Sequence, residues 1–285
     1  MSGTLLDGKA CANAILADLQ KKIHQLDPAL PMPQLAIIQV GIDPASSTYV
    51  RHKLVTGQKL GFHVSHWQLS ATVSQTELSH TIQQLNLDPT IHGILLQLPL
   101  PPSLCAEHHL AEIHPQKDVD GLHPTNLGYL VQHRSQLLPC TPKGILRLLD
   151  YYHLASVGLH AVIINNSTLV GRPLALLLLD LGATVTVCHS RTRDLSTLVA
   201  QADMVISATG ITHFIQTAWL KPGCIAIDVG VHRQPDGKLK GEFDFASAKS
   251  IAAYITPVPG GVGPVTVAQL MENLWQAYTN QGLNA

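Results

Sequence analysis

Short apolar segments alternate with helix-like stretches along most of this 285-residue chain. The apolar segments lie at residues 35–40, 91–98, 161–164, 183–188, 204–207 and 224–229. Runs of this length bounded by turn residues are typical of strands buried on both faces, and helical crossovers between such strands predict parallel sheets. We therefore expect an α/β protein with mostly parallel, doubly wound sheets.

Several helix-like stretches carry clear signals of their own. Residues 8–26 repeat leucine and isoleucine at intervals of three and four, and residues 44–60 are followed by Gly61, a typical C-terminal helix residue. The helix expected over residues 74–85 opens with the S-x-x-E sequence of a capping box. A last helix over residues 266–278 is expected to fold back on the first half of the chain.

Composition excludes several classes of protein. Only 13% of residues are charged, against the usual ~25%, and 46% are hydrophobic, so intrinsic disorder is excluded. Eighteen basic and nineteen acidic residues leave none of the positive excess that nucleic-acid binding requires. No apolar run approaches the ~18 residues of a membrane span, and the N-terminus lacks the basic segment of a signal peptide. We expect a cytoplasmic protein that binds neither nucleic acid nor membranes.

The segment after the strand at 161–164 carries the most informative ligand-binding signal. A polar turn that begins at Asn165 leads through Gly171 into an apolar helix, and the free amides of a helix N-terminus bind phosphate. A Rossmann fingerprint has glycine where Asn165 stands, although Asn is the non-glycine residue that best tolerates a left-handed backbone. The motif is consistent with a dinucleotide site and equally with an ordinary strand-to-helix turn.

The end of the next strand bears on the choice of nucleotide. NAD-binding folds place Asp or Glu there for the ribose hydroxyls. This chain instead has Ser190, Arg191 and Arg193, and hydroxyl and guanidinium groups suit a 2′-phosphate. The pattern favours NADP over NAD, the alternative being a solvated basic loop.

A second group of candidates lies in the first half of the chain. Tyr49 and Lys53 are four residues apart and share a helix face, where a desolvated lysine can transfer protons. Gln97 ends a strand at the edge where open α/β sheets bind ligands. Asp118 and Asp120 can accept hydrogen bonds from an amino-substituted heterocycle. Taken alone, a Tyr and Lys pair is more often surface, and two such aspartates are more often an acidic turn.

The sequence TPVPGGVGP at residues 256–264 has three prolines and three glycines. Proline stiffens the backbone while glycine allows close approach, so the segment suits a flat ligand better than it suits a plain linker.

The chain has sixteen histidines, which raises the question of a metal site. The nearest cluster, His108, His109, Glu112 and His114, matches no recognised ligand motif. We expect no metal.

Together these motifs closely resemble one family, the bifunctional methylenetetrahydrofolate dehydrogenase/methenyltetrahydrofolate cyclohydrolases. The matching stretches cover nearly the whole chain, and the two longest are very specific. They are PASSTYVRHK (44–53), GILLQLPLP (93–101), IHPQKDVDGLHPTNLG (113–128), PCTPKG (139–144), STLVGRP (167–173), CHSRT (188–192), SATG (207–210), IDVGV (227–231) and ITPVPGGVGPVTVAQLMEN (255–273).

The resemblance implies two α/β domains with an active cleft between them. Residues 1–138, completed by the C-terminal helix at 265–285, would form a folate-binding catalytic domain. Residues 139–264 would form a Rossmann-like NADP-binding domain with a mostly parallel sheet. Tetrahydrofolate derivatives as substrates and a homodimer are implied as well.

The resemblance also implies the residues of each site. Catalytic roles fall to Tyr49, Lys53, Gln97 and Asp120, with Asp120 holding the amino edge of the pterin. The folate would further contact Leu98, Pro259, Gly260 and Gly261. The nucleotide would contact Asn165, Asn166, Ser167, Ser190, Arg191, Thr209 and Val231.

The implied activity has two steps in one-carbon metabolism. NADP-dependent oxidation converts 5,10-methylenetetrahydrofolate to the 5,10-methenyl form, and hydrolysis then gives 10-formyltetrahydrofolate, with Lys53 serving the proton transfers. The sequence departs from the family pattern at Asn165, where glycine is usual, and at Glu242, where Asp is usual. Asn165 leaves open a cyclohydrolase with weakened or lost dehydrogenase activity. The intact catalytic set argues against a non-catalytic binding protein.

Overall fold

The computed structural model describes residues 3–234 and 236–282, and the chain divides into two compact units. The six-stranded unit combines the residues up to Asn13 with Thr141–Thr266. The three-stranded unit combines Ala14–Cys140 with the residues from Val267 on. The chain passes between them within α1 (Gly8–His24), at the start of α6 (Cys140–Tyr151) and within α10 (Val262–Gly282).

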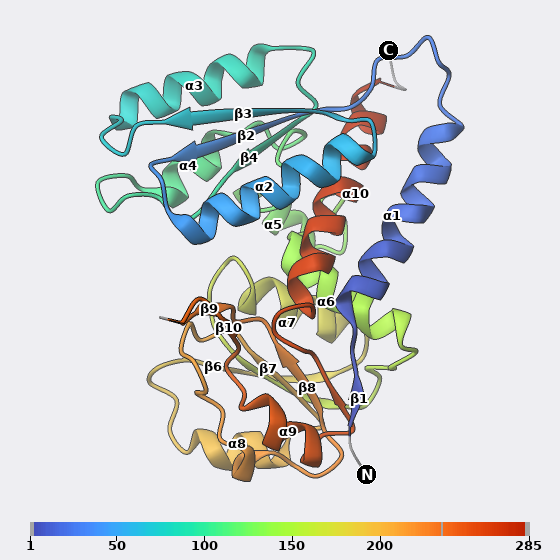
Figure 1. Cartoon of the computed structure of the whole chain (residues 1–285), viewed down its shortest axis with the longest axis vertical. Coiled ribbons are helices and arrows are strands. Elements are labelled where there is room, and N and C mark those ends of the chain that lie inside the picture. Colours follow the sequence, from blue (N-terminus) through green and yellow to red (C-terminus); the bar gives the residue numbers. More distant parts are fainter. Residues whose placement is uncertain (1–2, 235, 283–285) are drawn as a thin grey trace. The chain divides into compact units, whose positions relative to one another are not determined.

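The three-stranded unit is built on a parallel sheet in the order β3-β2-β4 (Figure 1). The strands are β2 (Gln34–Val40), β3 (His63–Leu69) and β4 (Gly93–Leu96), and the helices are α2 (Pro44–Lys59), α3 (Gln75–Leu87), α4 (Ala106–Glu112) and α5 (Pro124–Val131).

Successive side chains of β2 enter two different cores because a strand turns alternate residues to opposite faces. Leu35 and Ile37 pack with residues of α1, α2 and α10. Ala36 and Ile38 pack with residues of α3 and α4. Both faces of this sheet are therefore covered, and the last helix does fold back on the first half of the chain.

Local signals fixed the ends of two helices in this unit. The N–H of Gly61, at φ +80°, donates to Gln58 and the N–H of Phe62 donates to Gly57, which is a Schellman ending of α2. The Ser74–Glu77 capping box is formed at the start of α3. The sequence analysis missed β3, because this strand lies at the edge of the sheet beside β2 and its mostly exposed, polar side chains give no apolar run.

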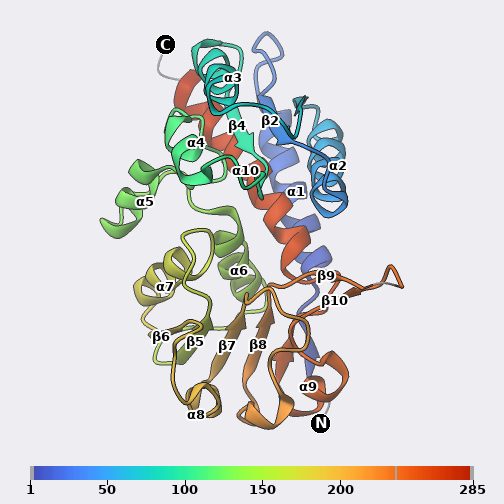
Figure 2. The same ribbon diagram turned by 90° about the vertical axis from the view of Figure 1, so that its left-hand side faces the viewer.

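The six-stranded unit has an all-parallel sheet in the order β1-β11-β8-β7-β5-β6, and Figure 2 shows β5, β7 and β8 side by side. Its strands are β1 (Thr4–Leu5), β5 (His160–Ile164), β6 (Thr184–Cys188), β7 (Met204–Ser207), β8 (Ile225–Asp228) and β11 (Tyr254–Ile255). Its other elements are α6, α7 (Gly171–Asp180), α8 (Leu195–Gln201), α9 (Phe245–Ile251), a short 3-10 helix (Thr217–Trp219) and the hairpin of β9 (His232–Arg233) and β10 (Leu239–Lys240).

This sheet is also buried on both sides. Val162 and Val205 pack with residues of α8 and α9, and the alternate residues Ile163 and Ile206 are equally buried. The sequence analysis missed α6 because it contains Pro142, although proline is tolerated in the first turn of a helix. The expected α/β architecture with parallel sheets is confirmed. None of the described helices is both long and apolar enough to cross a membrane.

Candidate active site

Lys53 and Gln97 form the centre of a polar group in the three-stranded unit. Lys53 lies on α2, and Gln97 follows β4 directly, where its backbone N–H donates to the carbonyl of Ile38. The Lys53 Nζ donates to Gln97 Oε1 at 2.9 Å, and Gln97 Nε2 donates to the Leu98 carbonyl at 2.6 Å. The second hydrogen bond fixes the orientation of the amide, so that its oxygen faces the lysine.

Burial weakens the preference of Lys53 for its charged form. Burial lowers the pKa of the Lys53 amine, because the charged form loses solvation, while the nearby Asp120 and Cys140 act in the opposite direction. Burial also raises the pKa of Tyr49, which lies one helical turn before Lys53. An amine with a lowered pKa can accept a proton closer to neutral pH than an ordinary lysine can.

The two aspartates of the KDVDG sequence have different roles. Asp118 is buried and accepts hydrogen bonds from the N–H groups of Gly121 (3.1 Å) and His123 (2.7 Å) and from Asn126 Nδ2 (2.8 Å). It holds the loop in place, and burial raises its pKa. Asp120 is partly exposed and close enough to Lys53 to act on its charge. Only Asp120 is therefore available to a ligand.

Lys117 and Asn273, which the sequence analysis passed over, anchor this loop. The Lys117 ammonium donates to the carbonyls of Leu85 (3.1 Å), Asn86 (2.8 Å) and Asp88 (2.7 Å) at the end of α3. Asn273 Nδ2 of α10 donates to the carbonyls of Val119 and Leu138 at 2.9 and 2.8 Å. Neither role has a signal in the local sequence.

The segment expected to contact folate from residue 256 onward lies in the six-stranded unit. The Val258–Pro259 bond is cis, and Gly260 has φ +106°. A Cβ on Gly8 would lie 1.7 Å from the Gly261 carbonyl oxygen, so the turn packs directly on the start of α1. Glycine at position 8 thus allows the backbone of the turn to pack closely on this helix.

Four neighbouring strands of the six-stranded sheet end in register. Ile164 pairs with Cys188 on one side and with Ser207 on the other, and Ser207 pairs with Asp228. The residues expected to bind nucleotide follow these strand ends: Asn165, Asn166 and Ser167 after β5, Ser190 and Arg191 after β6, Thr209 after β7 and Val231 after β8. They share the carboxyl edge of the sheet, where open α/β folds bind ligands.

Asn165 stands at the point where the strand order reverses, between β5 and β7. Its Oδ1 accepts hydrogen bonds from the N–H (2.8 Å) and hydroxyl (2.7 Å) of Ser167 and from the N–H of Gly171 (3.0 Å). Its Nδ2 donates to the carbonyl of Ala208 at 2.7 Å. The side chain thus links the turn after β5 to the turn after β7. It also occupies backbone N–H groups that are free to bind phosphate in a Rossmann turn.

Two family models match the chain over the regions that hold these two groups of residues. The catalytic-domain model of the tetrahydrofolate dehydrogenase/cyclohydrolase family matches residues 6–120, and the NAD(P)-binding-domain model of the same family matches residues 139–282. The chain belongs to the tetrahydrofolate dehydrogenase/cyclohydrolase family. The dehydrogenase/cyclohydrolase identity predicted from the motifs is confirmed, as is an NAD(P)-binding domain.

Relatives of this dehydrogenase/cyclohydrolase match it along its whole length. The bifunctional protein FolD of Paraburkholderia phytofirmans is 44% identical over 277 residues, 97% of each chain. The crystal structure of FolD from Campylobacter jejuni is 44% identical with a TM-score of 0.94, covering 98% of this chain and 99% of that one. The Trypanosoma brucei enzyme, crystallised with NADP and an inhibitor, is 35% identical with a TM-score of 0.95 over 100% of both chains.

The dehydrogenase/cyclohydrolase has a buried carboxylate pair, Asp228 and Glu242, that the sequence analysis did not place in any site. Asp228, the last residue of β8, accepts hydrogen bonds from the N–H groups of Gly230 (3.1 Å), Glu242 (2.7 Å) and Phe243 (3.0 Å). Burial, reinforced by the charge of Glu242, raises the pKa of Asp228 to about 7. The sequence signal that could have pointed to Asp228 is an acidic residue at the end of an apolar strand.

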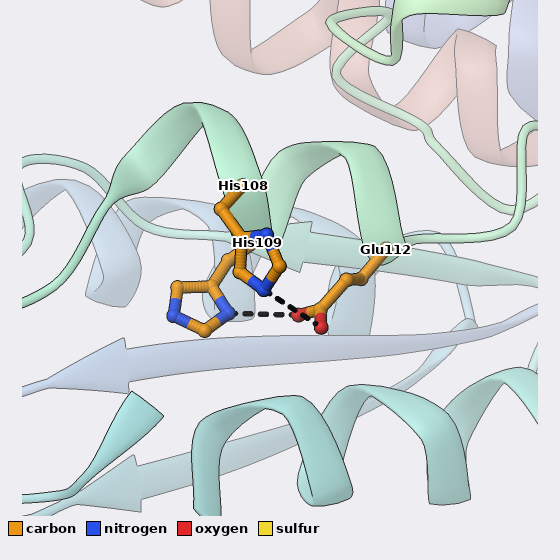
Figure 3. Close-up of side chains that lie close together, drawn as sticks. All are labelled: His108, His109 and Glu112. Atoms are coloured by element: carbon orange, nitrogen blue, oxygen red, sulfur yellow. Dashed lines mark hydrogen bonds and ion pairs between the residues drawn. The ribbon is translucent and has the colours of Figure 1, made fainter. Parts of the chain in front are cut away.

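The histidine cluster of this dehydrogenase/cyclohydrolase is partly assembled on α4. His108 Nε2 and His109 Nδ1 lie 3.2 and 2.8 Å from the two carboxylate oxygens of Glu112, toward which both rings turn (Figure 3). His114 instead accepts a hydrogen bond from the N–H of Gln116. The shared carboxylate accounts for the position of both rings.

Proposed function

We propose that this enzyme oxidises 5,10-methylenetetrahydrofolate with NADP⁺ and hydrolyses the 5,10-methenyl product to 10-formyltetrahydrofolate, with Lys53 as the proton-transfer group. The observation that carries the proposal is the 2.9 Å hydrogen bond that orients Lys53 Nζ on Gln97, made by an amine whose pKa burial lowers. Such an amine can both take up and release a proton during one reaction cycle.

Hydrolysis of the methenyl cation adds water and releases one proton overall. As the water oxygen bonds to the methenyl carbon, the neutral Lys53 amine takes a proton from that water. The resulting ammonium gives its proton to a ring nitrogen as the bond from that nitrogen to the carbon breaks, and the hydroxyl proton leaves to solvent. Gln97 holds Nζ in place through both steps, and Tyr49 assists from the same helix.

The substrate side of the proposal uses the residues implied by the family resemblance. Tyr49, Lys53, Gln97, Leu98 and Asp120 would contact the folate together with Pro259, Gly260 and Gly261, and Asp120 would accept hydrogen bonds from the amino edge of the pterin. When bound, NADP⁺ supplies the hydride acceptor. The contribution of the chain to the oxidation is to hold the two reactants in contact, which alone lowers a barrier substantially.

The residues at the edge of the six-stranded sheet fit NADP better than NAD. Ser190 and Arg191 are exposed just past the end of β6, and residues 188–193 contain neither Asp nor Glu. A hydroxyl and a guanidinium are donors suited to a 2′-phosphate. Asn165, Asn166, Ser167, Thr209 and Val231 would hold the rest of the nucleotide.

One assay tests both halves of the proposal. The purified protein is mixed with 5,10-methylenetetrahydrofolate and either NADP⁺ or NAD⁺, and nucleotide reduction and methenyl hydrolysis are followed as separate signals. We expect both signals, with NADP⁺ preferred. Absence of hydrolysis would contradict the role of Lys53, and equal rates with NAD⁺ would contradict the role of Ser190 and Arg191.

A second candidate function is a cyclohydrolase with weakened or lost dehydrogenase activity. It is favoured by Asn165, whose Oδ1 occupies the N–H groups of Ser167 and Gly171. In the same assay this function gives hydrolysis of added methenyltetrahydrofolate without nucleotide reduction.

We further propose that the enzyme is a homodimer formed through the outer edge of the six-stranded sheet. Within residues 3–234 and 236–282, β6 pairs only with β5, and Val187 on β6 is exposed together with Leu179 and Leu181 at the end of α7. An open strand edge with apolar side chains is a surface that proteins usually cover. Light scattering should give twice the chain mass, and Val187→Lys should give the monomer.

A further inference from the structure

Glu242 is the most thoroughly hydrogen-bonded buried side chain at the edge of the six-stranded sheet. It is fully buried, and its Oε2 accepts hydrogen bonds from the hydroxyl of Ser207 and from the N–H (2.7 Å) and hydroxyl (2.8 Å) of Thr209. Its Oε1 accepts from the N–H of Gly210 at 2.7 Å. All these donors lie within residues 207–210, the end of β7 and the turn that follows it.

The backbone around Glu242 is arranged to hold this carboxylate in place. Its own N–H donates to Asp228 Oδ2 at 2.7 Å, and its carbonyl accepts from Ile215 at 3.0 Å. A Cβ on Gly230 would lie 2.4 Å from Glu242 Cγ and Oε1, so glycine is needed there to leave room. His232 Nε2 lies 3.5 Å from Glu242 Oε1, and the charge of Glu242 acts on the buried Asp228.

The turn that Glu242 holds has little freedom of its own. The Thr209 hydroxyl donates to Glu242 and accepts from the N–H of Ile211 at 3.2 Å, so both of its functions are occupied. On the other side, the carbonyl of Ala208 accepts from Asn165. Glu242 thus holds Thr209, whose polar hydrogens face the protein, while Asn165 holds the neighbouring Ala208, so the turn is fixed from two sides.

We propose that Glu242 is a positioning residue of the NADP site, which fixes the backbone of the 207–210 turn next to the cofactor. This inference rests on the proposed NADP site. Glu242 acts through the turn because a fully buried side chain has no surface to offer a ligand. Loss of its contacts should weaken cofactor binding while leaving hydrolysis at Lys53, in the other unit, unchanged.

The experiment compares Glu242→Gln with the wild-type protein. Calorimetry measures the Kd for NADP⁺, and the two signals of the assay above give the KM for NADP⁺ and the rate of methenyl hydrolysis. The amide places an NH₂ group against donors that now face a carboxylate oxygen. We expect Kd and KM for NADP⁺ to rise about tenfold, with hydrolysis within about twofold of wild type, since hydrogen bonds to charged groups are stronger than neutral ones. Glu242→Asp keeps the charge but withdraws it by one methylene, so its Kd and KM for NADP⁺ should lie between those of the wild-type protein and those of Glu242→Gln.

The control is Asp244→Asn, an exposed carboxylate two residues away whose side chain makes no helix-cap hydrogen bond. It should leave every measurement unchanged. If Glu242→Gln fails to fold, Ser207→Ala removes one donor of the same set and should raise Kd about threefold.

An unchanged Kd for NADP⁺ in Glu242→Gln, or in Ser207→Ala where that variant replaces it, overturns the inference. An equal loss of hydrolysis and cofactor binding overturns it as well, because the residue would then be merely structural. Absence of NADP⁺ binding by the wild-type protein overturns the proposed cofactor itself, and the inference with it.

Discussion

The Lys53 group and the sheet edge around Asn165 differ in how many of their polar atoms are already hydrogen-bonded within the protein. Lys53 has a single hydrogen-bond partner among the side chains that surround it in the described residues, and burial shifts its pKa away from that of an ordinary amine. At the sheet edge, Asn165 and Glu242 between them bind the donors of both turns. The first group keeps its reactivity available, whereas the second is a rigid support. Substitutions should therefore change reaction rate in the first region and cofactor affinity in the second.

The strongest way to break this comparison is Lys53→Met. A positioned proton-transfer group contributes about 10²- to 10⁴-fold, so we expect methenyl hydrolysis to fall by that factor and hydride transfer to fall much less. The matched control is Lys59→Met, an exposed lysine near the end of the same helix. An equal loss of both activities would argue against a specific role in proton transfer.

Arg191→Ala examines the other region. Loss of a charge-assisted hydrogen bond costs about 1.5–3 kcal/mol, so the KM for NADP⁺ should rise roughly 10- to 100-fold, while the KM for NAD⁺ stays the same. Lys238→Ala, an exposed cation in the same unit, serves as the control. If the KM values for NADP⁺ and NAD⁺ change by the same factor, Arg191 does not bind the 2′-phosphate.

Asn165→Gly separates the contribution of Asn165 to stability from its effect on the affinity for NADP⁺. The variant loses the hydrogen bonds that brace the two turns, so the free energy of unfolding should fall by about 1–2 kcal/mol. It also frees the N–H groups of Ser167 and Gly171 for phosphate, so the KM for NADP⁺ should fall up to about tenfold. Urea denaturation and initial rates measure the two effects, with the exposed Asn166→Gly as the stability control. A higher KM would show that direct contacts of Asn165 with the cofactor outweigh the gain from the freed N–H groups.

The buried Asp228 should make the stability of the six-stranded unit depend on pH. Its pKa of about 7 lies above that of an unfolded chain, so the folded state binds the proton more tightly. Stability is therefore lost as the pH rises toward 7 and regained as the pH falls below it, by at most about 1.4 kcal/mol per pH unit. Urea denaturation at pH 8 and pH 6 measures this change. Asp228→Asn should lose this part of the dependence, and a variant with the wild-type slope would contradict the prediction.

Asp120→Asn makes the smallest change, a displacement of the pH profile of hydrolysis. Because the Asp120 charge raises the pKa of Lys53, its removal should lower that pKa further and move the rising limb of the profile to lower pH. The rates are measured at saturating folate so that weaker substrate binding does not enter. A shift to higher pH would mean that Asp120 does not act on Lys53 electrostatically.

The fold was readable from the sequence wherever the signal was local. The apolar run at 35–40 became β2, and the S-x-x-E sequence at 74–77 became a formed capping box. The failures have physical reasons as well. The strand β3 is polar because it lies at an edge, and β1 and β11 are too short to show any periodicity. The start of α6 is obscured by a proline that its first turn tolerates.

The sequence by itself determined the order of those strands and helices that carry a local signal, their parallel pairing and the list of candidate side chains, because apolar spacing and helix capping act over a few residues. The tertiary structure decided which candidates meet. Lys53 reaches Gln97 from 44 positions away, and Glu242 reaches the turn at 207–210 from more than 30. Burying a charge or an amide is costly unless a partner satisfies it. These partners come from distant segments, so only the folded chain reveals which side chain is reactive and which is a support.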